Sequence, residues 1–554
     1  MKRQLNLLGL LLVSTFLAPL ASQPIARAGY LTLYGGPTYD QTTGTGLRDG
    51  WVAYLPGSGL TNSGMAVGNA YKIVGGSFKD SRAVRWDSSG AGAMEMGILG
   101  TDGNGVTRAC AYAVNAGDTA VGHALLFVDG SNKGDRAVRW SASGAVTELG
   151  NLGVDSNGST IARAYAVNAG GTAVGIATLF LDGINKGYRA ARWSDSGMVT
   201  ELDGLGIGSN GRAFSRAGAV NDAGTAVGYA NKYVGGSDKG LRAVRWNASG
   251  TAATELGELG TDIAGWTDAE AYAVNSAGTA VGEAILYVGG SNKGYRAVRW
   301  DASGTAATEL GGLGTDGNGY TEAEARVVNT AGTAVGWAEK FVGGIDKGPR
   351  AVRWDASGTA ATELGDLGTD NNGYAEAHAW AVSDAGTAVG WSEKYVNGNY
   401  VDYRAVLWGA DGLAVDLNSL IDPGSGWKLT EAAAISKNGM WISGQGTYDP
   451  DGPGPLLGYT RLFMIQMFPW GDANRDGIVD MADYALWFNN YGSSGATNLQ
   501  GDMTGDGLVD MADYAAWFND YGSGGEISVP EPATLTLLAF GGLAVLRRRR
   551  RWKS

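Results

Sequence analysis

The chain has 554 residues, a formal net charge of −13 and 92 glycines, but only one cysteine and two histidines. The negative charge argues against nucleic acid as a partner, because phosphate binding needs cations. A single cysteine, Cys110, excludes an internal disulfide framework and is expected to be a small buried apolar residue. With only His123 and His378 present, a histidine-rich metal site is also excluded.

The N-terminus has the order of an export signal. Basic residues 2 and 3 precede an apolar run over residues 5–20, and the small-residue site Ala26-Arg27-Ala28 follows. Positive charge, apolar run and small-residue cleavage site are typical of a secretory signal peptide. We predict that residues 1–28 are this signal.

One unit repeats eight times through the body of the chain, in steps of 53 or 54 residues. The glycine that ends TAVG-like segments recurs at Gly68, Gly122, Gly175, Gly228, Gly282, Gly336, Gly390 and Gly444. The tryptophan that ends RAVRW-like segments recurs at Trp86, Trp140, Trp193, Trp246, Trp300, Trp354 and Trp408. A fixed period of this kind indicates one architecture in eight copies.

Each copy contains four short apolar segments. In residues 271–311, two surround an Asn-x-Ala-Gly turn, and two more, after a glycine-rich loop, surround an Asp-x-Ser-Gly turn. Four short strands in a meander are typical of one propeller blade. The sequence therefore predicts a mainly β fold, an eight-bladed β-propeller over residues 29–468.

The two ends of the repeat region complement each other. The last copy has its hairpin and a third strand at residues 461–465, but no fourth strand before Pro469. Residues 31–36 match the fourth-strand segment that residues 309–312 supply in another copy. We expect the N-terminal strand to complete the last blade and hide the sheet edges; an open solenoid is the alternative.

The repeat resembles the bacterial extracellular repeat family known as HAF over most of residues 50–465. It shares the Ala-x-x-Val-Asn-x-x-Gly-x-x-Val-Gly hairpin and the Ala-x-x-Trp strand that follows. Arginine stands where that family usually has histidine, as at Arg136, Arg189, Arg242 and Arg296. The resemblance implies an extracellular location and brings no activity with it.

Two polar positions recur in the copies and predict a cross-strand ion pair in each blade. The fourth strands carry Glu148, Glu201, Glu255, Glu309 and Glu363, and the third strands carry Arg139, Arg192, Arg245, Arg299 and Arg353. Loops that begin at Thr101, Thr315 and Thr369 are rich in Asp, Asn and Gly. Calcium binding and simple turn formation both remain open for these loops.

Other positions vary between copies, as an asymmetric site requires. The position after the TAVG glycine is Asn69, His123, Ile176, Tyr229, Glu283, Trp337 and Trp391, and the slot of Tyr112, Tyr165 and Tyr272 becomes Arg326 and then Trp380. The tryptophans can stack on sugar rings or serve as packing. A hydrolytic carboxylate pair is conceivable among Glu283, Glu322, Glu324 and Glu376, with His378 nearby in sequence. No nucleophile elbow, phosphate loop or metal-protease motif is present.

Two near-copies of a calcium-loop pattern lie near the C-terminus, each with oxygen-bearing residues at loop positions 1, 3, 5, 9 and 12 and glycine at position 6. The first set of expected ligands is Asp472, Asn474, Asp476, the Ile478 carbonyl, Asp480 (directly or through water) and Asp483. The second set is Asp502, Thr504, Asp506, the Leu508 carbonyl, Asp510 and Asp513. Because a hydroxyl replaces an amide oxygen at Thr504, we expect weaker binding in the second loop.

Apolar residues at i, i+3, i+4 and i+7 after each loop predict one amphipathic exit helix. Glycine and proline replace the entering helix of an ordinary EF-hand. Loop plus exit helix, twice over residues 469–524, resembles the type I dockerin module of cellulosomal proteins. That resemblance implies two Ca²⁺ ions, a cohesin domain as partner, and partner-choosing residues at Met481, Ala482, Met511 and Ala512.

The last 30 residues, 525–554, form a tripartite tail. Val529, Pro530, Glu531 and Pro532 precede an apolar stretch shorter than the roughly 20 residues of a full membrane span, and five arginines follow. This order resembles the PEP-CTERM sorting signal. It implies recognition by an exosortase-type enzyme, transient membrane anchoring and delivery to the envelope or matrix of a Gram-negative-type bacterium; a plain single-pass anchor is the alternative.

Together these features predict an exported, non-catalytic binding or assembly protein attached through calcium-dependent dockerin–cohesin contact, with polysaccharide as a conceivable ligand. The alternative is a polysaccharide-degrading enzyme, a glycosidase or lyase, tethered by the same module. The cohesin, the ligand of the ring and the fate of the tail are not fixed by the sequence.

Overall fold

The computed structural model describes residues 31–35, 39–40, 45–52, 59–87, 93–452, 454, 456–468, 471–474, 478–504 and 507–522. The chain divides into two compact units, Met1–Gln466 and Met467–Ser554. The predicted signal peptide and the predicted sorting tail lie outside the described residues. The predicted domain boundaries at residues 28, 468 and 524 stay predictions.

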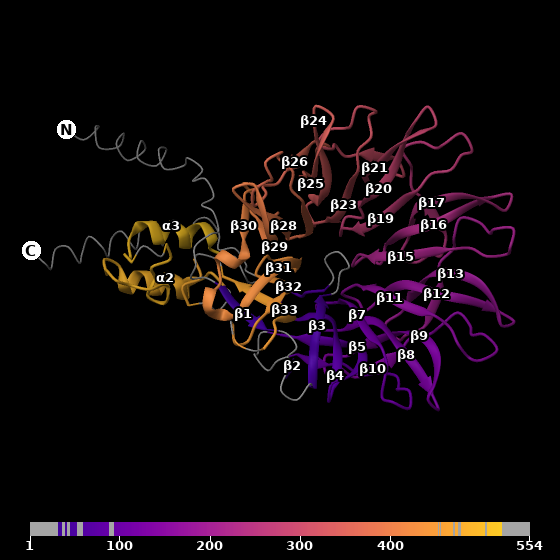
Figure 1. Cartoon of the computed structure of the whole chain (residues 1–554), viewed down its shortest axis with the longest axis horizontal. Coiled ribbons are helices and arrows are strands. Elements are labelled where there is room, and N and C mark those ends of the chain that lie inside the picture. Colours follow the sequence, from indigo (N-terminus) through magenta and orange to yellow (C-terminus); the bar gives the residue numbers. More distant parts are fainter. Residues whose placement is uncertain are drawn as a thin grey trace, which may run out of the picture. The chain divides into compact units, whose positions relative to one another are not determined.

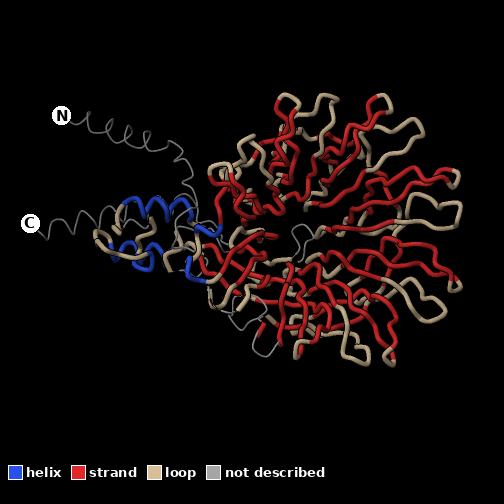
Figure 2. Tube along the Cα trace, viewed as in Figure 1, coloured by secondary structure: helices blue, strands red, loops and turns tan. Residues whose placement is uncertain are grey.

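The described part of the first unit contains eight sheets arranged around a common centre (Figure 1, Figure 2). Seven sheets have four strands and one has five. In Figure 1 the first strand of a blade lies nearest the centre. The prediction of a mainly β, eight-bladed propeller is confirmed.

The strands recur with the period of the sequence. The first strands are β3 (Thr45–Val52), β7 (Ala109–Val114), β11 (Ala162–Val167), β15 (Ser215–Val220), β19 (Ala269–Val274), β23 (Ala323–Val328), β27 (Ala377–Val382) and β31 (Trp427–Ile435). The second strands are β4 (Ala66–Val74), β8 (Ala120–Val128), β12 (Ala173–Leu181), β16 (Ala226–Val234), β20 (Ala280–Val288), β24 (Ala334–Val342), β28 (Ala388–Val396) and β32 (Trp441–Tyr448).

The outer half of each blade consists of one long and one short strand. The third strands are β5 (Ser77–Trp86), β9 (Ser131–Trp140), β13 (Ile184–Trp193), β17 (Ser237–Trp246), β21 (Ser291–Trp300), β25 (Ile345–Trp354), β29 (Asn399–Trp408) and β33 (Tyr459–Met467). The fourth strands are β6 (Met94–Glu95), β10 (Val146–Glu148), β14 (Val199–Glu201), β18 (Ala253–Glu255), β22 (Ala307–Glu309), β26 (Ala361–Glu363), β30 (Ala414–Asp416) and β1 (Leu31–Gly35). A short extra strand, β2 (Tyr39–Asp40), pairs with β3, and the 3-10 helices η1 (Leu417–Ser419) and η2 (Pro423–Ser425) follow β30.

The N-terminal strand closes the ring. The last blade has the order β1-β33-β32-β31, so a strand from residues 31–35 lies beside one from residues 459–467. This confirms the predicted closure and excludes the open solenoid. Pairing the two ends removes the free edges that an open array of sheets would present.

The blades pack through small residues and, in the first seven blades, one large ring. Most alanines of the first two strands are buried, as are valines near the start of second strands such as Val121 and Val174, and Trp140, Trp193 and Trp246 at the ends of third strands are fully buried. In six of these blades the indole N–H of the tryptophan donates to a backbone carbonyl of the preceding blade, as from Trp193 to Gly150 at 2.7 Å. The same bond, at 2.7–2.9 Å, joins Trp140 to Gly97, Trp246 to Asp203, Trp300 to Gly257, Trp354 to Gly311 and Trp408 to Gly365.

The predicted ion pairs exist, but with a different arginine. Glu148 pairs with Arg136 (Nε to Oε1, 3.0 Å) and not with Arg139. In the antiparallel register Glu148 lies opposite Val138, so it shares a face with Arg136, whereas Arg139 points to the other face. The equivalent pairs are Arg82 with Glu95, Arg189 with Glu201, Arg242 with Glu255, Arg296 with Glu309 and Arg350 with Glu363.

The arginines that were expected in these pairs connect blades instead. Arg245 donates to the carbonyls of Asp301 and Ala302, in the Asp-x-Ser-Gly turn of the next blade, at 2.9 and 3.0 Å. Arg139, Arg192, Arg299 and Arg353 reach the corresponding turn in the same way. This arginine therefore satisfies turn carbonyls between neighbouring blades.

An asparagine relay joins the blades as well. The Asn221 amide donates to the Asn275 carbonyl of the next blade at 2.9 Å, while its Oδ1 accepts the Thr225 N–H of its own turn at 3.0 Å. The same interblade bond runs from Asn115 to Asn168, from Asn168 to Asn221, from Asn275 to Asn329 and from Asn329 to Ser383. The turn residue that shapes one hairpin thus also holds the next blade.

We predict that Asn221→Ala lowers the free energy of unfolding by about 1–3 kcal/mol, because it leaves buried backbone groups without their partners. The exposed turn residue Asn247 is the matched control, and Asn247→Ala should change stability by no more than about 0.5 kcal/mol. Urea unfolding of the full chain measures both. Equal effects for the two variants would contradict the role of the relay.

Candidate functional site

The second unit contains two helices in the predicted places. Helix α2 (Met481–Asn490) begins at the N-cap Asp480, and helix α3 (Met511–Asp520) begins at the N-cap Asp510. Each helix start has a capping box, in which the cap and the third helical residue, Asp483 or Asp513, bond to each other's backbone. A short 3-10 helix, η3 (Asn498–Gln500), lies between them.

Four carboxylates of the two loops are buried. Asp472 and Asp483 are 0% exposed, and Asp502 and Asp513 are 2% and 0% exposed. Asp483 accepts the backbone N–H groups of Asn474 and Asp480 at 3.0 and 2.8 Å. Asp513 repeats this pattern with Thr504 and Asp510, both at 2.8 Å. The acids at loop positions 1 and 12 therefore turn inward in both halves.

The two loops differ at position 3. The Thr504 hydroxyl donates to Oδ1 of Asp513 at 2.9 Å, which engages one oxygen of that carboxylate. Burial raises the pKa of Asp513, with the charge of Asp502 as a smaller contribution in the same direction. The expectation of a weaker second site stays a prediction.

The donor set of each loop suits a hard cation, because it consists of carboxylates, a carbonyl and an amide or hydroxyl oxygen. The position-5 residues Asp476 and Asp506 lie outside the described residues. Among the residues that are described, no three His, Cys, Asp or Glu side chains gather into a metal-binding group. Asp480 and Asp510 act as helix caps, because their carboxylates accept the N–H of Ala482 and Ala512.

The two halves hold each other through their tryptophans. The Trp487 indole donates to the carbonyl of Asp510 at 2.6 Å, and the Trp517 indole donates to that of Asp480 at 2.7 Å. Both rings are 3% exposed and lie in a core with Ala473, Val479, Met503 and Val509. Each tryptophan therefore contacts the N-cap residue of the other half's helix.

The predicted partner residues lie at the surface. Met481 is 37% exposed and Met511 is 52% exposed, and Ala482 and Ala512 beside them are exposed as well. All four occupy the first turns of α2 and α3. They are accessible, while the loop carboxylates close by are not.

In the propeller, the inner strands carry an asymmetric row of polar residues. Equivalent positions of β7, β11, β15, β19, β23 and β27 are Cys110, Arg163, Arg216, Glu270, Glu324 and His378, and in the register they lie opposite His123, Ile176, Tyr229, Glu283, Trp337 and Trp391. Basic residues thus occupy the third and fourth blades, and acidic residues the fifth and sixth. Comparison of this slot across the repeats would have revealed Arg163, Arg216 and Glu270, which the sequence prediction missed. Cys110 is partly buried.

In the acidic part of this row, the fifth blade contains two glutamates whose pKa values are raised. Burial, reinforced by the neighbouring charge of Glu324, raises the pKa of Glu283 to about 8. Burial also raises the pKa of Glu270 to about 7. Glu283 accepts a hydrogen bond from the Tyr272 hydroxyl at 2.7 Å. Glu324 pairs with Arg326 and accepts the indole N–H of Trp337 at 2.9 Å.

An aromatic cluster surrounds His378. Its ring stacks on Trp391 with centroids 4.8 Å apart, and Trp337 and Trp380 lie at 5.2 and 5.3 Å. Burial lowers the pKa of His378 to about 4, helped by the charge of Arg326. The three predicted tryptophans therefore gather around a neutral imidazole and are half-buried, not freely exposed.

The other predicted acids do not join the row. Glu322 accepts from the Tyr320 hydroxyl, and its backbone N–H donates to Glu339. Glu376 repeats this arrangement with Tyr374 and Glu393 one blade later. Within the expected hydrolytic set, the pair that interacts is Glu283 and Glu324, since the charge of Glu324 raises the pKa of Glu283.

The aspartate loops of the ring act as turns. Oδ1 of Asp316 accepts the N–H groups of Asn318 and Tyr320, both at 2.8 Å. Asp102 and Asp370 do the same in their loops. This geometry favours turn formation over calcium binding there.

Residues 528–551 match the family model described as the PEP-CTERM protein-sorting motif. The match includes the four predicted sorting residues. The chain is therefore an exported, surface-sorted protein with a propeller fold, and its motif implies recognition by an exosortase-type enzyme and a membrane-anchoring tail. Among the described residues no helix has the length and apolar character to cross a bilayer.

The search of curated proteins found no match. Among solved structures, the β-propeller domain of the Trilobed protease from Pyrococcus furiosus is 9% identical with a TM-score of 0.35, covering 72% of this chain and 98% of that one. TolB from Acinetobacter baumannii is 14% identical with a TM-score of 0.25, covering 50% and 60%. The GH74 xyloglucanase from Xanthomonas campestris is 10% identical with a TM-score of 0.33, covering 77% and 74%. These values carry no conclusion about activity.

We predict that the propeller loses stability as pH rises towards 8 and that Glu283→Gln reduces this loss. The folded state keeps the Glu283 proton up to a pKa of about 8, whereas the ordinary value is 4.5. The protonated carboxyl therefore contributes fully below the ordinary value, and its contribution is lost as pH rises through about 8. At about 1.4 kcal/mol for each pKa unit, the wild-type change is on the order of a few kcal/mol.

Urea unfolding between about pH 5 and pH 9 measures this slope. The exposed Glu258 in the preceding loop is the control, and Glu258→Gln should keep the wild-type slope. A slope unchanged in Glu283→Gln would contradict the assignment of the buried proton.

Proposed function

We propose that this surface-sorted protein is held at its site of action by its second unit, a calcium-loaded dockerin-like module that binds a cohesin domain. The propeller is then a non-catalytic ring that the module places at the envelope or in the matrix. The observation that supports this most is the pair of inward-turned, buried carboxylates in each of two equivalent loops. Buried charges in proteins are generally paired or coordinate metals.

Calcium would be held in the first loop by Asp472, Asn474, Asp476, the Ile478 carbonyl, Asp480 and Asp483, and in the second by Asp502, Thr504, Asp506, the Leu508 carbonyl, Asp510 and Asp513. The ions would supply positive charge between acids that approach one another, and so favour the folded unit. Each reciprocal tryptophan bond ends at the cap residue of the opposite loop, which supports coupling between metal binding and the packing of the unit.

Calcium should raise the melting temperature of the second unit. A ligand that binds only the folded state stabilises by about 2.7 kcal/mol at 100 times its Kd. Calorimetry of the full chain, with calcium or with chelator, should show the shift, and Asp472→Asn combined with Asp502→Asn should abolish it. Asp182→Asn, an exposed propeller residue, is the control. Identical melting in calcium and chelator would rule out the metal assignment.

The docking surface would comprise Met481 and Ala482 in one half and Met511 and Ala512 in the other. Because the halves are near-copies with the same exposed pair, either one can face the partner. Immobilised type I cohesin modules should therefore retain the full chain carrying Met481→Asp or Met511→Asp alone, and release the double variant. Retention should require calcium.

Met198→Asp is the control, since Met198 is 71% exposed on the propeller. If one of the single variants loses retention, the module binds the cohesin in one orientation and not in two. Full retention of the double variant would exclude this surface altogether.

Carbohydrate is the ligand class that we propose for the ring, because half-buried aromatic rings lie beside polar groups on its inner strands. A second candidate function is polysaccharide degradation. It is favoured by Glu283, whose pKa burial and the charge of Glu324 raise to about 8, because a glycosidase needs a carboxyl group that keeps its proton and a second carboxyl group on the other side of the bond. Release of reducing sugars that is lost in Glu283→Gln would establish this alternative.

A further inference from the structure

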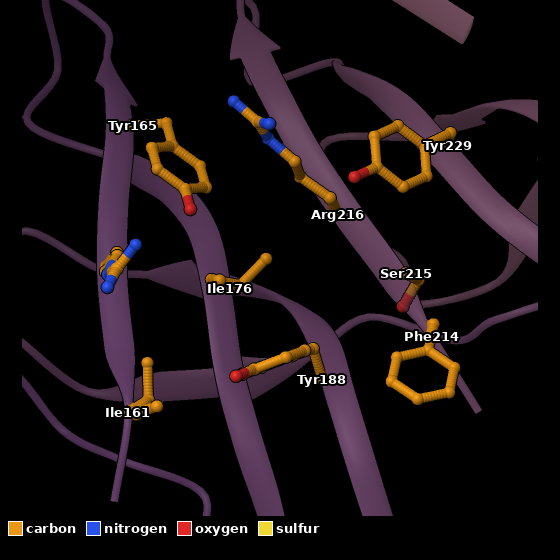
Figure 3. A pocket seen from close by; sticks show the side chains of 9 residues that line it. Ile161, Tyr165, Ile176, Tyr188, Phe214, Ser215, Arg216 and Tyr229 are labelled. Atoms are coloured by element: carbon orange, nitrogen blue, oxygen red, sulfur yellow. The ribbon is translucent and has the colours of Figure 1, made fainter. Parts of the chain in front are cut away.

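A pocket of about 280 Å³ lies between the third and fourth blades of the propeller (Figure 3). Its size is near the lower end of the roughly 300–1,000 Å³ of ligand pockets, so it admits one ring and not a polymer. It is lined by Ile161, Arg163, Tyr165, Ile176, Tyr188, Phe214, Ser215, Arg216 and Tyr229.

One lining guanidinium has no carboxylate partner. No acid of the described residues lies within ion-pair distance of Arg216; its neighbours are the Tyr165 ring, 4.2 Å from the guanidinium carbon, and the Tyr229 hydroxyl. In Figure 3 Arg216 lies between these two tyrosines, and the Tyr229 hydroxyl points towards it. Arg163, by contrast, pairs with Asp135 of the second blade (Nε to Oδ2, 2.8 Å).

The pocket therefore has one positive charge without an ion-pair partner among the described residues. Glu270 of the fifth blade interacts with Arg216 electrostatically at longer range, and burial raises the pKa of that group to about 7. One available charge suits a monoanion better than a phosphate dianion. The planar guanidinium offers two parallel N–H groups, which match the geometry of a carboxylate.

The other walls suit a hydroxylated ring. Tyr165, Tyr188 and Tyr229 combine flat rings with hydroxyl groups, and Ser215 adds a hydroxyl that accepts the Ala190 N–H at 2.8 Å. Burial raises the pKa of Tyr229, so its hydroxyl keeps a proton to donate. Tyr188 is 37% exposed, which leaves the pocket open to solvent. Aromatic faces with a few polar groups are the usual lining of such sites.

We propose that this pocket binds the carboxylate-bearing ring of an acidic saccharide, with its carboxylate on Arg216 and its ring against Tyr165 and Tyr188. The site is confined to one blade junction, because the fifth and sixth blades carry Glu270 and Glu324 where the fourth has Arg216. This rests on the carbohydrate-binding part of the proposed function and not on the calcium-dependent attachment.

Calorimetric titration of the full chain with glucuronate tests the proposal. We expect a millimolar Kd, with glucose, acetate and inorganic phosphate each binding at least about tenfold more weakly. Arg216→Gln should weaken glucuronate binding by at least about tenfold, whereas Arg212→Gln, a change of an exposed arginine four residues earlier, should not. Tyr229→Phe keeps the ring and should weaken binding by several fold.

Three results would overturn the proposal. These are no heat of binding for glucuronate, equal binding of acetate or phosphate, and wild-type binding by both Arg216→Gln and Tyr229→Phe. Circular dichroism and melting of each variant distinguish lost binding from lost fold. Retention on cohesin modules should be unchanged in Arg216→Gln, and glucuronate binding should survive chelator, so a failure of the attachment mechanism is distinguishable from a failure of this site.

Discussion

The propeller depends on hydrogen bonds that pass from one blade to the next. In five consecutive blades an asparagine side chain shapes its own turn with its oxygen and holds the next blade with its nitrogen, as Asn221 does. A tryptophan near the rim reaches the preceding blade, and an arginine reaches the following one. Because every blade is held on both sides, the cost of an open end is high, and the ring is completed by the strand β1 from the other end of the chain.

This repeated framework leaves certain positions free to vary. The residues that connect blades recur with the period of the sequence, while the slot of Arg216 on the inner strands holds arginine, glutamate or histidine in different blades. The backbone there is the same in each copy, so substitution changes the chemistry and not the fold. The result is a ring with a basic arc, an acidic arc and an aromatic cluster. The repeated scaffold thereby presents a different surface at each blade. A site that binds a single ligand needs such a difference between the blades.

The features that depend on the repeat period could be predicted from the sequence. The side-chain contacts that depend on the three-dimensional arrangement of the strands could not. Blade number and closure follow from the spacing of tryptophans and glycines and from the missing fourth strand of the last copy. The partner of Glu148 was misassigned, because a shift of three residues along a strand moves a side chain to the opposite face. Arg163 and Arg216 are 53 residues apart and meet only because adjacent repeats become adjacent blades. The raised pKa of Glu283 arises from burial, which no local pattern reveals.

In the second unit the repeat has a different effect, because its two near-identical halves bond to each other. Trp487 lies in the helix that follows the first loop and bonds to the carbonyl of Asp510, the N-cap of the second helix; Trp517 bonds to the carbonyl of Asp480 in the same way. A cation that orders one loop would fix its exit helix, and through the tryptophan the cap of the other loop. The second, threonine-bearing loop would then gain order from occupancy of the first. Identical exposed Met-Ala pairs on both helix starts would allow the whole unit to dock either way round without rebuilding its core.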